Sequence, residues 1–404
     1  MILRKIKHKI RTITTDFEIR ILKQRAEHYG YDVKLKEPIK ESEVVIENYF
    51  KTVYNKSALI SYIIYPFIDG IKNYHSNNRE CFVIAEILRE LEFNVDIIHW
   101  DNTTYIPNKN YEVVIDNHNN LERLKPYLSE STRKIFHATN ANWLYQNWVE
   151  YGLYYEFFLK KGVSIAPPRI MSFANSVEYC DFISIFGNEF TKSTYGSYSH
   201  KAHQLPMSIT ISPEINTEKD FSSAKSKFVW LNSHGALLKG LDIVIDVFTK
   251  QPHRELYICG DLNRDAAFRD AISILLSQAP NIKTVGWVDV DGDLFKEITS
   301  KCAWVLSTSF SEGGGGSTLN CMAKGLIPVV TKSSSLTLPE NTGFYLQENT
   351  VSELADLLKK ISVLDECELK KMSFNSYQFV SSNHTIENFK LRYKEFLNNV
   401  LIPE

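Results

Sequence analysis

Short apolar runs alternate with segments of helical periodicity through the first half of the chain. The first run, 57–66, is followed by a polar loop and then by a segment in which Ile84, Ile87, Leu88 and Leu91 recur at helical spacing. Further strand-like runs lie at 94–99, 111–116, 133–137 and 182–186. Alternation of this kind predicts a parallel sheet covered by helices, and we expect the last of these runs to close the domain.

A second series of the same kind follows the polar stretch 206–227, which we interpret as a linker. It opens with the apolar run 228–231 and an amphipathic helical segment at 241–248. Later strand-like runs lie at 256–260, 282–286 and 303–306, and helical segments follow at 351–361 and from Met372 onward. At 404 residues the chain is too long for one core and suits two α/β domains of ordinary size.

Composition narrows the class of protein. With 46 basic and 48 acidic residues the chain has no strong overall charge, so nucleic acid is not the expected partner. The six cysteines form no CxxC pair, which argues against a zinc site and a disulfide framework and favours a reducing, cytoplasmic location. No apolar run reaches 18 uncharged residues, so we expect a soluble or peripheral protein.

The first 25 residues differ in character from the rest. They carry eight Lys and Arg residues against Asp16 and Glu18, and isoleucines fall near one helical stripe at Ile2, Ile6, Ile10 and Ile13. A basic amphipathic helix of this type can lie on an anionic membrane at its cytoplasmic face. The alternative is that the stripe docks on the protein's own surface or frays.

A glycine loop near residue 312 carries the clearest chemical signal. After the apolar run 303–306, Glu312 precedes four glycines, and Ser317 or Thr318 is a plausible N-cap for a helix that ends near Gly325. Free amides of the loop and first helical turn would face a phosphate, and the Glu312 carboxylate would accept hydrogen bonds from hydroxyl groups. The amides belong to Gly313, Gly314, Gly315, Gly316, Ser317 and Thr318.

Other interpretations of the loop fit less well. A glycine run can be only a flexible connection, but its place between an apolar strand and a helix start favours a ligand site, because open α/β sheets bind ligands at the carboxyl ends of their strands. A P-loop needs a lysine after the last glycine, and the dinucleotide fingerprint needs a third glycine where Thr318 stands. Amides for phosphate and a carboxylate for hydroxyls together suggest a nucleotide-sugar.

These motifs together carry a resemblance. From about Ser57 onward the chain resembles the retaining glycosyltransferases of the GT-B fold, in the large, family-four-like group 1 of bacterial polysaccharide and glycolipid transferases. The acidic glycine loop, the helix that ends in Gly325 and the Pro-Val-Val strand at 328–330 match the family's signature. The turn at 239–242 resembles the family's lysine-glycine turn, Thr308 and Ser309 fall where its Pro-Ser pair sits, and 285–288 resembles the strand end that contacts the nucleobase.

The resemblance implies an α/β fold with two Rossmann-like domains facing across a cleft and C-terminal helices that return to the N-terminal domain. We divide the chain into a basic helical N-terminal extension (1–50), an acceptor-side domain (51–210), a nucleotide-sugar-binding domain (211–380) and a returning C-terminal helix (381–404). The implied reaction transfers a sugar with retention from a nucleotide-sugar, most simply a UDP-sugar, to a glycan or lipid-linked acceptor of the cell envelope. Neither a metal nor another cofactor is expected.

The resemblance also assigns roles. The Lys239 ammonium and the loop amides would neutralise the departing diphosphate, and Glu312 would orient hydroxyls of the donor sugar. His137, in a Phe-His segment at a strand end, would approach the donor sugar and the acceptor, although a histidine at such a place is often structural. Candidates for the nucleobase contact are Gly286, Trp287 and Val288, and candidates on the acceptor side are His75 and His118.

The chain departs from the family pattern at three places. The family's second glutamate, which usually holds the ribose, is Asn320 here, and this amide either bonds a hydroxyl or serves only as a local cap or packing residue. The arginine that normally precedes the lysine-glycine turn is missing, so Lys239 neutralises the diphosphate alone or with His234. The loop at 69–78 lacks paired glycines, which favours an unusual acceptor.

Two rival functions stay open at this stage. An enzyme of the same fold could modify the sugar-nucleotide itself, as an epimerase does, and would need no acceptor site. A non-catalytic binding protein with a decayed donor site is the second rival, because Asn320 and the missing arginine both weaken the pattern.

Overall fold

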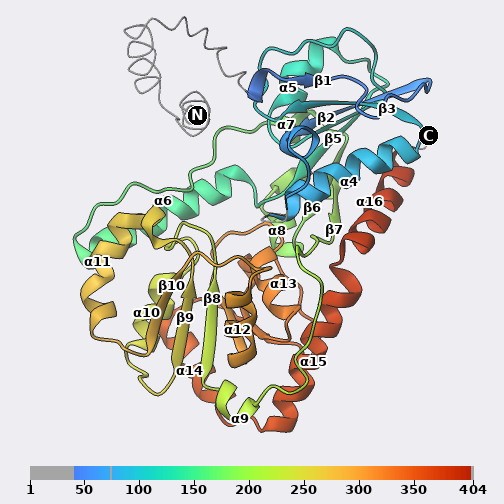
Figure 1. Ribbon diagram of the computed structural model, residues 1–404. Coiled ribbons are helices and arrows are strands. Elements are labelled where there is room, and N and C mark those ends of the chain that lie inside the picture. The colour runs from blue at the N-terminus through green and yellow to red at the C-terminus, as the bar shows by residue number, and fades with distance from the viewer. Residues whose placement is uncertain (1–40, 73–74, 402–404) are drawn as a thin grey trace, which may run out of the picture. The chain divides into compact units, whose positions relative to one another are not determined.

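The computed structural model describes residues 41–72 and 75–401, and its first half is built on a mixed sheet (Figure 1). In space the strands follow the order β1-β3-β2-β4-β5-β6-β7, and all neighbours are parallel except β1, which runs antiparallel to β3. The strands are β1 (Val45–Ile46), β2 (Lys56–Tyr62), β3 (Phe93–His99), β4 (Val113–Asp116), β5 (Arg133–Ala138), β6 (Phe182–Phe186) and β7 (Ala202–Leu205). The central strands β2 and β4 are almost wholly buried, as expected where helices cover both faces of a sheet.

The connections of this half carry its helices. The α-helices are α3 (Tyr65–Ile68), α4 (Ser76–Glu90), α5 (Asn120–Leu124), α6 (Trp143–Lys161), α7 (Ser176–Tyr179) and α8 (Glu189–Ser193), and the 3-10 turns are η1 (Glu41–Glu43), η2 (Lys125–Tyr127) and η3 (Gly196–Lys201). Helix α6 begins where the Asn142 side chain accepts a hydrogen bond from Leu144 N, and it ends at Gly162 in the left-handed conformation.

The second half is built on a sheet of parallel strands in the order β10-β9-β8-β11-β12-β13. These strands are β8 (Lys227–Leu231), β9 (Glu255–Cys259), β10 (Ile282–Gly286), β11 (Trp304–Ser307), β12 (Ile327–Thr331) and β13 (Phe344–Leu346). The helices are α9 (Phe221–Ala224), α10 (Leu241–Phe248), η4 (Leu262–Asp265), α11 (Ala266–Ser277), α12 (Asp293–Lys301), α13 (Gly316–Met322), η5 (Lys332–Ser334) and α14 (Val351–Ile361).

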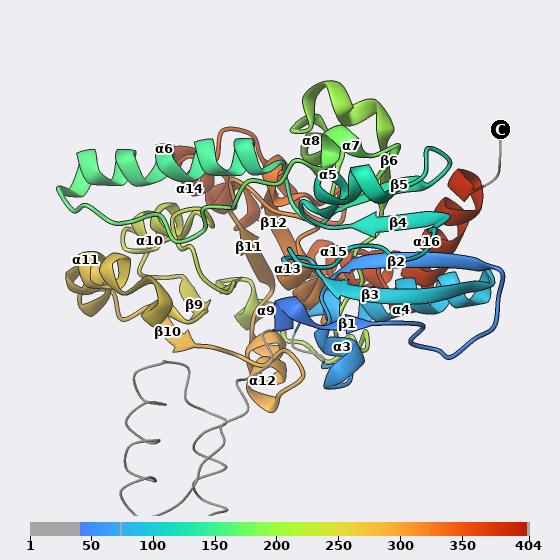
Figure 2. The same cartoon turned by 90° about the horizontal axis from the view of Figure 1, so that it is seen from above.

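Two long helices, α15 (Glu366–Asn383) and α16 (Ile386–Leu401), close the described chain. Helix α16 lies beside α4 of the first half, as Figure 1 and Figure 2 both show. The Glu90 carboxylate on α4 pairs with Lys390 Nζ at 2.7 Å and with Lys394 Nζ at 2.8 Å. The C-terminal helix therefore returns to the first sheet.

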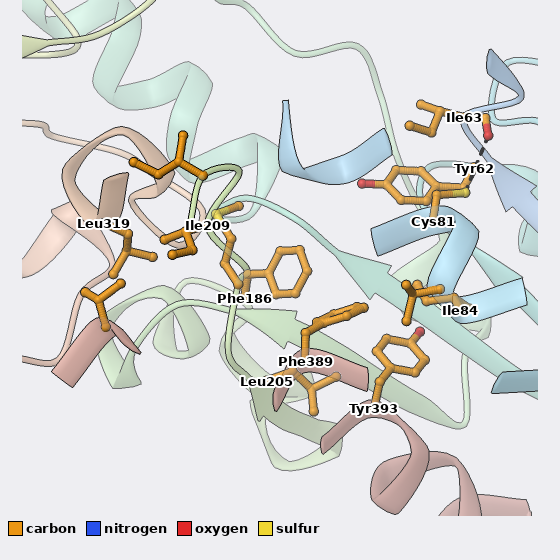
Figure 3. Close-up of a cluster of buried hydrophobic side chains, with 14 of the residues drawn as sticks. Tyr62, Ile63, Cys81, Ile84, Phe186, Leu205, Ile209, Leu319, Phe389 and Tyr393 are labelled. Atoms are coloured by element: carbon orange, nitrogen blue, oxygen red, sulfur yellow. Dashed lines mark hydrogen bonds between the residues drawn. The ribbon is translucent and has the colours of Figure 1, made fainter. Parts of the chain in front are cut away.

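One buried apolar cluster runs through both halves. It contains residues of the first sheet, such as Ile60, together with Val305 of β11 in the second. Figure 3 shows Phe389 and Tyr393 of α16 packed with Phe186 of β6 in this cluster, with Leu319 of α13 on its other side. Burial of this size is the main source of stability in a domain.

Helix α6 crosses from the first half to the second. Its Tyr154 and Phe157 belong to a buried apolar cluster of the second half, and the Phe157 ring lies 5.6 Å from that of Phe268 on α11. Figure 1 and Figure 2 show α6 running out from the first sheet toward α10 and α11. The chain of the first half thus contributes directly to the surroundings of the second sheet.

The predicted fold class is confirmed: the protein is α/β, with two Rossmann-like sheets whose strands are all parallel apart from the edge strand β1. Several details differ from the sequence prediction. The first sheet starts at Val45, inside the predicted extension, and β7 lies beyond the expected last strand. Strand β7 was missed because it is a short edge strand whose central residues, His203 and Gln204, are polar and exposed.

The basic segment 1–25, with its predicted membrane contact, lies outside the described residues. None of the helices in the described part of the chain combines the length and apolar character needed to cross a bilayer.

Candidate active site

Lys239 is positioned by a tight turn between β8 and α10. Gly240 adopts the left-handed conformation, with φ of +64°, and a Cβ atom there would lie 2.1 Å from the carbonyl oxygen of Thr308. The Thr308 hydroxyl donates to the carbonyl oxygen of Lys239 at 3.0 Å, and Phe310 N donates to Leu238 O at 2.9 Å. The lysine-glycine turn is therefore fixed against the segment that follows β11.

The Lys239 ammonium forms a buried ion pair with the carboxylate of Glu312. The exposed fractions of the two side chains are 4% and 19%. Ser309 Oγ also donates to Glu312 Oε1 at 3.0 Å, and Lys239 Nζ lies 3.3 Å from Ser311 O. The structure thus brings together a cation and a carboxylate that lie 73 residues apart in the sequence.

Burial and mutual attraction act in opposite directions on this pair. Burial lowers the pKa of Lys239 to about 8, although the Glu312 charge partly offsets that effect. Burial would raise the pKa of Glu312, but the charge and hydrogen bond of Lys239 outweigh it and hold that pKa below its ordinary value. Both groups are therefore ionised at neutral pH. The ammonium can bind an anion, and the adjacent carboxylate can accept a hydrogen bond from a hydroxyl group.

The first glycine of the loop is needed for a close contact between the two halves. A Cβ atom on Gly313 would fall 1.7 Å from the carbonyl oxygen of Thr139, in the segment between β5 and α6. The Glu312 carbonyl oxygen accepts from Ala141 N at 3.3 Å and from Ser335 Oγ at 2.7 Å. The glycine loop is therefore held from the first half on one side and from the β12–β13 connection on the other.

Helix α13 begins earlier than the sequence suggested. Its N-cap is Gly315, in the left-handed conformation with φ of +66°, so the prediction of Ser317 or Thr318 as N-cap is wrong. Among the described residues no side chain caps this end, so the amides of Gly316, Ser317 and Thr318 open the helix without an intrahelical partner. The loop approaches apolar groups as well, because Met207 lies 3.1 Å from the Cβ position of Gly314.

His234 does not add a positive charge. Burial, helped by the charges of Arg169, Arg264 and Lys239, lowers the pKa of His234 to about 4. The imidazole is therefore neutral at pH 7, and Lys239 is the ammonium of this turn.

Asn320 is hydrogen-bonded to Thr210, which lies in the connection between the halves. Its Nδ2 donates to Thr210 Oγ1 at 3.0 Å, and its Oδ1 accepts from Thr210 N at 3.1 Å. Both polar atoms of the amide therefore have partners, and the side chain is buried. This arrangement favours the packing alternative over a contact with ribose.

The candidate nucleobase contact lies at the end of an edge strand. Gly286 closes β10 with φ of +86°, and no atom lies within 4 Å of a Cβ atom built on it. The next side chain, Trp287, is 59% exposed, whereas Val288 is buried in the core. An exposed indole at the carboxyl end of a parallel strand offers a flat surface for stacking.

The three candidate histidines lie in different surroundings. His137 is fully buried, with its ring edge-on to those of Tyr62, Phe186 and Tyr393, and its Nδ1 lies 2.9 Å from Ser184 Oγ. Burial lowers the pKa of His137 to about 3, so the ring is neutral. This placement favours the structural alternative for His137, because Tyr393 of α16 covers it.

His118 lines a small pocket at the carboxyl ends of β4 and β5. Its Nε2 lies 2.8 Å from Ser172 Oγ, and its ring packs against Trp100 with centroids 4.8 Å apart. Burial lowers its pKa. The pocket holds about 60 Å³ and is also lined by residues that include Asn117, Thr139, Asn140, Trp143 and Tyr195. Since Thr139 also contacts Gly313, the pocket borders the glycine loop.

His75 caps α4, because its Nδ1 accepts from Asn77 N at 3.2 Å. Burial lowers the pKa of His75, and the nearby charge of Arg169 adds to this effect. The same Arg169 charge acts on Lys239 and Glu312, so the arginine lies near both the β2–α4 loop and the ion pair. Sequence reasoning missed Arg169, and no local pattern around it pointed to the site.

Within the residues that the structure describes, His, Cys, Asp and Glu side chains do not gather in groups of three or more that could hold a metal ion.

Comparisons with known proteins agree on the fold and on one domain. Residues 227–362 match the family model "Glycosyl transferases group 1". No curated protein matches the sequence. A glycosyltransferase from Rickettsia africae superimposes with a TM-score of 0.56 at 12% identity, over 87% of this chain and all of the other.

Two further solved structures are similar. Alr3699/HepE of Anabaena, crystallised with UDP and glucose, gives a TM-score of 0.55 at 11% identity over 85% of this chain and 99% of its own. Sucrose-phosphate synthase of Thermosynechococcus elongatus gives 0.58 at 12% identity, over 85% and 98% of the two chains. The chain thus has the GT-B fold, and its residues 227–362 match the group 1 glycosyltransferase domain.

Proposed function

We propose that the protein is a glycosyltransferase that moves a sugar from a nucleotide-sugar, a UDP-sugar, to a hydroxyl group of a glycan or lipid-linked acceptor. The observation that carries the proposal is the buried ion pair between Lys239, before α10, and Glu312, in the loop before α13; both lie inside the matched segment 227–362. The crystal complex of Anabaena HepE with UDP and glucose supports the choice of donor, since the two chains share a fold.

Each part of the site has a task in this reaction. The bond between the anomeric carbon and the diphosphate breaks through an oxocarbenium-like state, and negative charge builds on the diphosphate. The Lys239 ammonium and the amides of Gly316, Ser317 and Thr318 are fixed before this charge develops, so they stabilise it without reorganising. In the donor complex Glu312 would turn from Lys239 toward hydroxyls of the donor sugar.

Finer features of the proposal follow the family resemblance. The anomeric configuration is retained and no metal takes part. The acceptor enters from the side of His75 and the His118 pocket and belongs to a cell-envelope polysaccharide. The reaction takes place in the cytoplasm, with residues 1–25 in contact with the anionic face of the membrane. Sedimentation with phosphatidylglycerol vesicles tests that contact, and a variant with these Lys and Arg residues replaced by Glu would no longer sediment.

Replacement of Glu312 tests the proposed function. We expect Glu312→Ala to lower the release of UDP from a UDP-sugar by at least about 100-fold, a typical loss when a transition-state contact is removed. Removal also leaves Lys239 buried without a partner, so Glu312→Gln, which keeps a hydrogen-bonding group, is made alongside and both are checked by thermal unfolding. Near-normal turnover by a folded Glu312→Ala protein would contradict the proposal.

A second candidate is a binding protein without turnover. The engagement of Asn320 by Thr210 and the neutral state of His234 favour it, because both remove groups that would hold a donor. A thermal-shift screen across nucleotide-sugars, followed by an assay for free nucleotide, separates the two functions. Binding of a UDP-sugar without release of UDP would support the binding protein.

A further inference from the structure

Arg169 belongs to the first half of the chain, yet its side chain packs against the turn that carries Lys239. It lies in the connection between α6 and α7. A Cβ atom on Gly235, which has φ of +83°, would lie 2.2 Å from Arg169 Cδ, so this glycine leaves the room that the arginine occupies. The Nη1 group of Arg169 lies 3.4 Å from His234 O.

The backbone of Arg169 is fixed by buried side chains of α6. Its N donates to Glu150 Oε1 at 2.9 Å, and its carbonyl oxygen accepts from Gln146 Nε2 at 2.9 Å. The Gln146 Oε1 atom in turn accepts from Ser311 Oγ at 3.3 Å, next to Glu312. One chain of hydrogen bonds therefore ties Arg169 to the loop of the ion pair, which distinguishes it from a mobile surface arginine.

The charge of Arg169 reaches the residues of the site. It helps to lower the pKa of Lys239, His234 and Glu312. Among the described residues its Nε is buried without a hydrogen-bond partner. Asp265 of the second half also feels the Arg169 charge, but its carboxylate accepts a hydrogen bond from Gly235 N at 2.8 Å. A buried guanidinium N–H with no acceptor is costly, and an anion would satisfy it.

The ion pair by itself cannot neutralise a diphosphate. Lys239 and Glu312 carry opposite charges and sum to zero, whereas a diphosphate brings at least two negative charges. A second cation near the pair is therefore needed for strong binding, and guanidinium groups match the geometry of phosphate oxygens.

We propose that Arg169 is the second cation of the diphosphate site, supplied by the first half of the chain to a donor held on the second half. This inference rests on the proposed function and deepens it. It gives the first half a direct contact with the donor. Donor affinity therefore depends on the position of α6, whose side chains hold the Arg169 backbone.

Calorimetry on the full-length protein tests Arg169. We expect Arg169→Gln to weaken the binding of UDP by about 10- to 100-fold, as the loss of a charge-assisted hydrogen bond does, and to leave the binding of uridine unchanged. Arg169→Lys should recover part of the affinity, because it keeps the charge and loses the fork of donors. Arg269→Gln replaces a half-exposed arginine paired with Asp270 on α11; it is the matched control and should bind UDP like the wild type.

Titration with inorganic pyrophosphate separates this inference from the proposed function. If the wild type binds pyrophosphate through Arg169 but releases no UDP from any UDP-sugar, the transferase proposal fails and the Arg169 site stands. Unchanged UDP and pyrophosphate affinity in Arg169→Gln, equal losses for UDP and uridine, or no anion binding by the wild type would each overturn the assignment. Should Arg169→Gln fail to fold, the Arg169→Lys protein decides, and wild-type affinity for UDP and pyrophosphate in it would count against a forked contact.

Discussion

At the scale of single residues, the site depends on a charge pair kept away from water. An isolated buried ammonium loses its proton readily, and here the Glu312 carboxylate keeps Lys239 charged at neutral pH. The pKa of Lys239 is only about 8, so the ammonium loses its proton about one pH unit above neutrality. The protonation of one residue thus sets the pH range in which the site can attract an anion.

The affinity for UDP should therefore fall as pH rises through about 8. The pKa of Lys239 lies below its ordinary value, so the ammonium is complete below pH 7 and is lost above pH 8. Linkage then weakens UDP binding by up to about tenfold per pH unit above that point. Calorimetry between pH 6.5 and 9.5 measures the effect.

Two controls isolate Lys239 in this experiment. Lys239→Arg stays charged over the whole range and should show a flat profile above pH 7.5, whatever its absolute affinity. Uridine carries no phosphate and should bind equally at all these values. A slope in Lys239→Arg that matches the wild type would assign the titration to another group.

At the scale of elements, each motif of the second half joins a strand to a helix through glycine. Gly240 and Gly315 both take the left-handed conformation, and each is the N-cap of the helix that follows. Gly313 serves a different purpose, since it allows the loop to touch the segment after β5. The glycines at 240 and 315 thus shape helix starts, and the one at 313 brings the halves into contact.

Gly313→Ala should disturb both folding and function. The added methyl group would meet the carbonyl oxygen of Thr139 at 1.7 Å, so the contact between the halves must open, at a cost of about 1–3 kcal/mol. We expect a lower unfolding temperature and weaker UDP binding. Gly152→Ala, in the middle of α6 with no atom within 4 Å of the new methyl group, is the control and should stabilise the protein by up to about 1 kcal/mol. Equal unfolding temperatures for the two variants would contradict the close contact.

Local sequence patterns were enough to predict most strands and the two central residues of the site, Lys239 and Glu312. Buried strands such as β4 and β11 are short apolar runs, and the Lys239 turn and Glu312 loop lie directly after β8 and β11, where motifs can be recognised. Strands β1 and β13 were not predicted, because they have only two and three residues. A strand that short carries no period of its own.

Residues placed by distant partners could not be predicted. Arg169 reaches His234 across 65 positions, and nothing in its neighbourhood marks it as part of a site. His137 looked accessible at a strand end, but the covering Tyr393 comes from the last helix, 256 positions later. Long-range packing of this kind is decided by the whole fold, which a motif does not contain.

At the scale of the whole molecule, the two halves are joined by more than one connection. Helix α16 returns to α4, α6 crosses to the second core, and Glu80 of α4 holds the connecting segment through Ser208. The Glu80 carboxylate accepts from Ser208 N at 2.6 Å and from Ser208 Oγ at 2.9 Å, and it is fully buried. A buried acid at this junction makes the stability of the whole molecule depend on pH.

Glu80→Gln should stabilise the protein above pH 7. Burial raises the pKa of Glu80 to about 7, although the hydrogen bonds from Ser208 oppose this effect. The folded acid binds its proton more tightly than the unfolded one, whose ordinary pKa is 4.5, so stability falls as pH rises from 4.5 to 7 and then stays low. A neutral amide avoids this loss of up to about 3 kcal/mol.

Thermal unfolding at pH 5 and pH 8 measures this difference. The unfolding temperature of Glu80→Gln should exceed that of the wild type at pH 8 and lie close to it at pH 5. Glu130→Gln, at an exposed position, should change neither value. A gain that is the same at both pH values would show that Glu80 does not titrate in this range.

The position of α6 across the two halves also bears on the rate of turnover. Gln146 of α6 accepts a hydrogen bond from Ser311, next to Glu312 of the ion pair, and the same helix is anchored by Tyr154 and Phe157 in the second core. We expect substitutions that tighten these anchors to raise heat resistance and, where release of the nucleotide needs a movement of α6, to slow turnover as well.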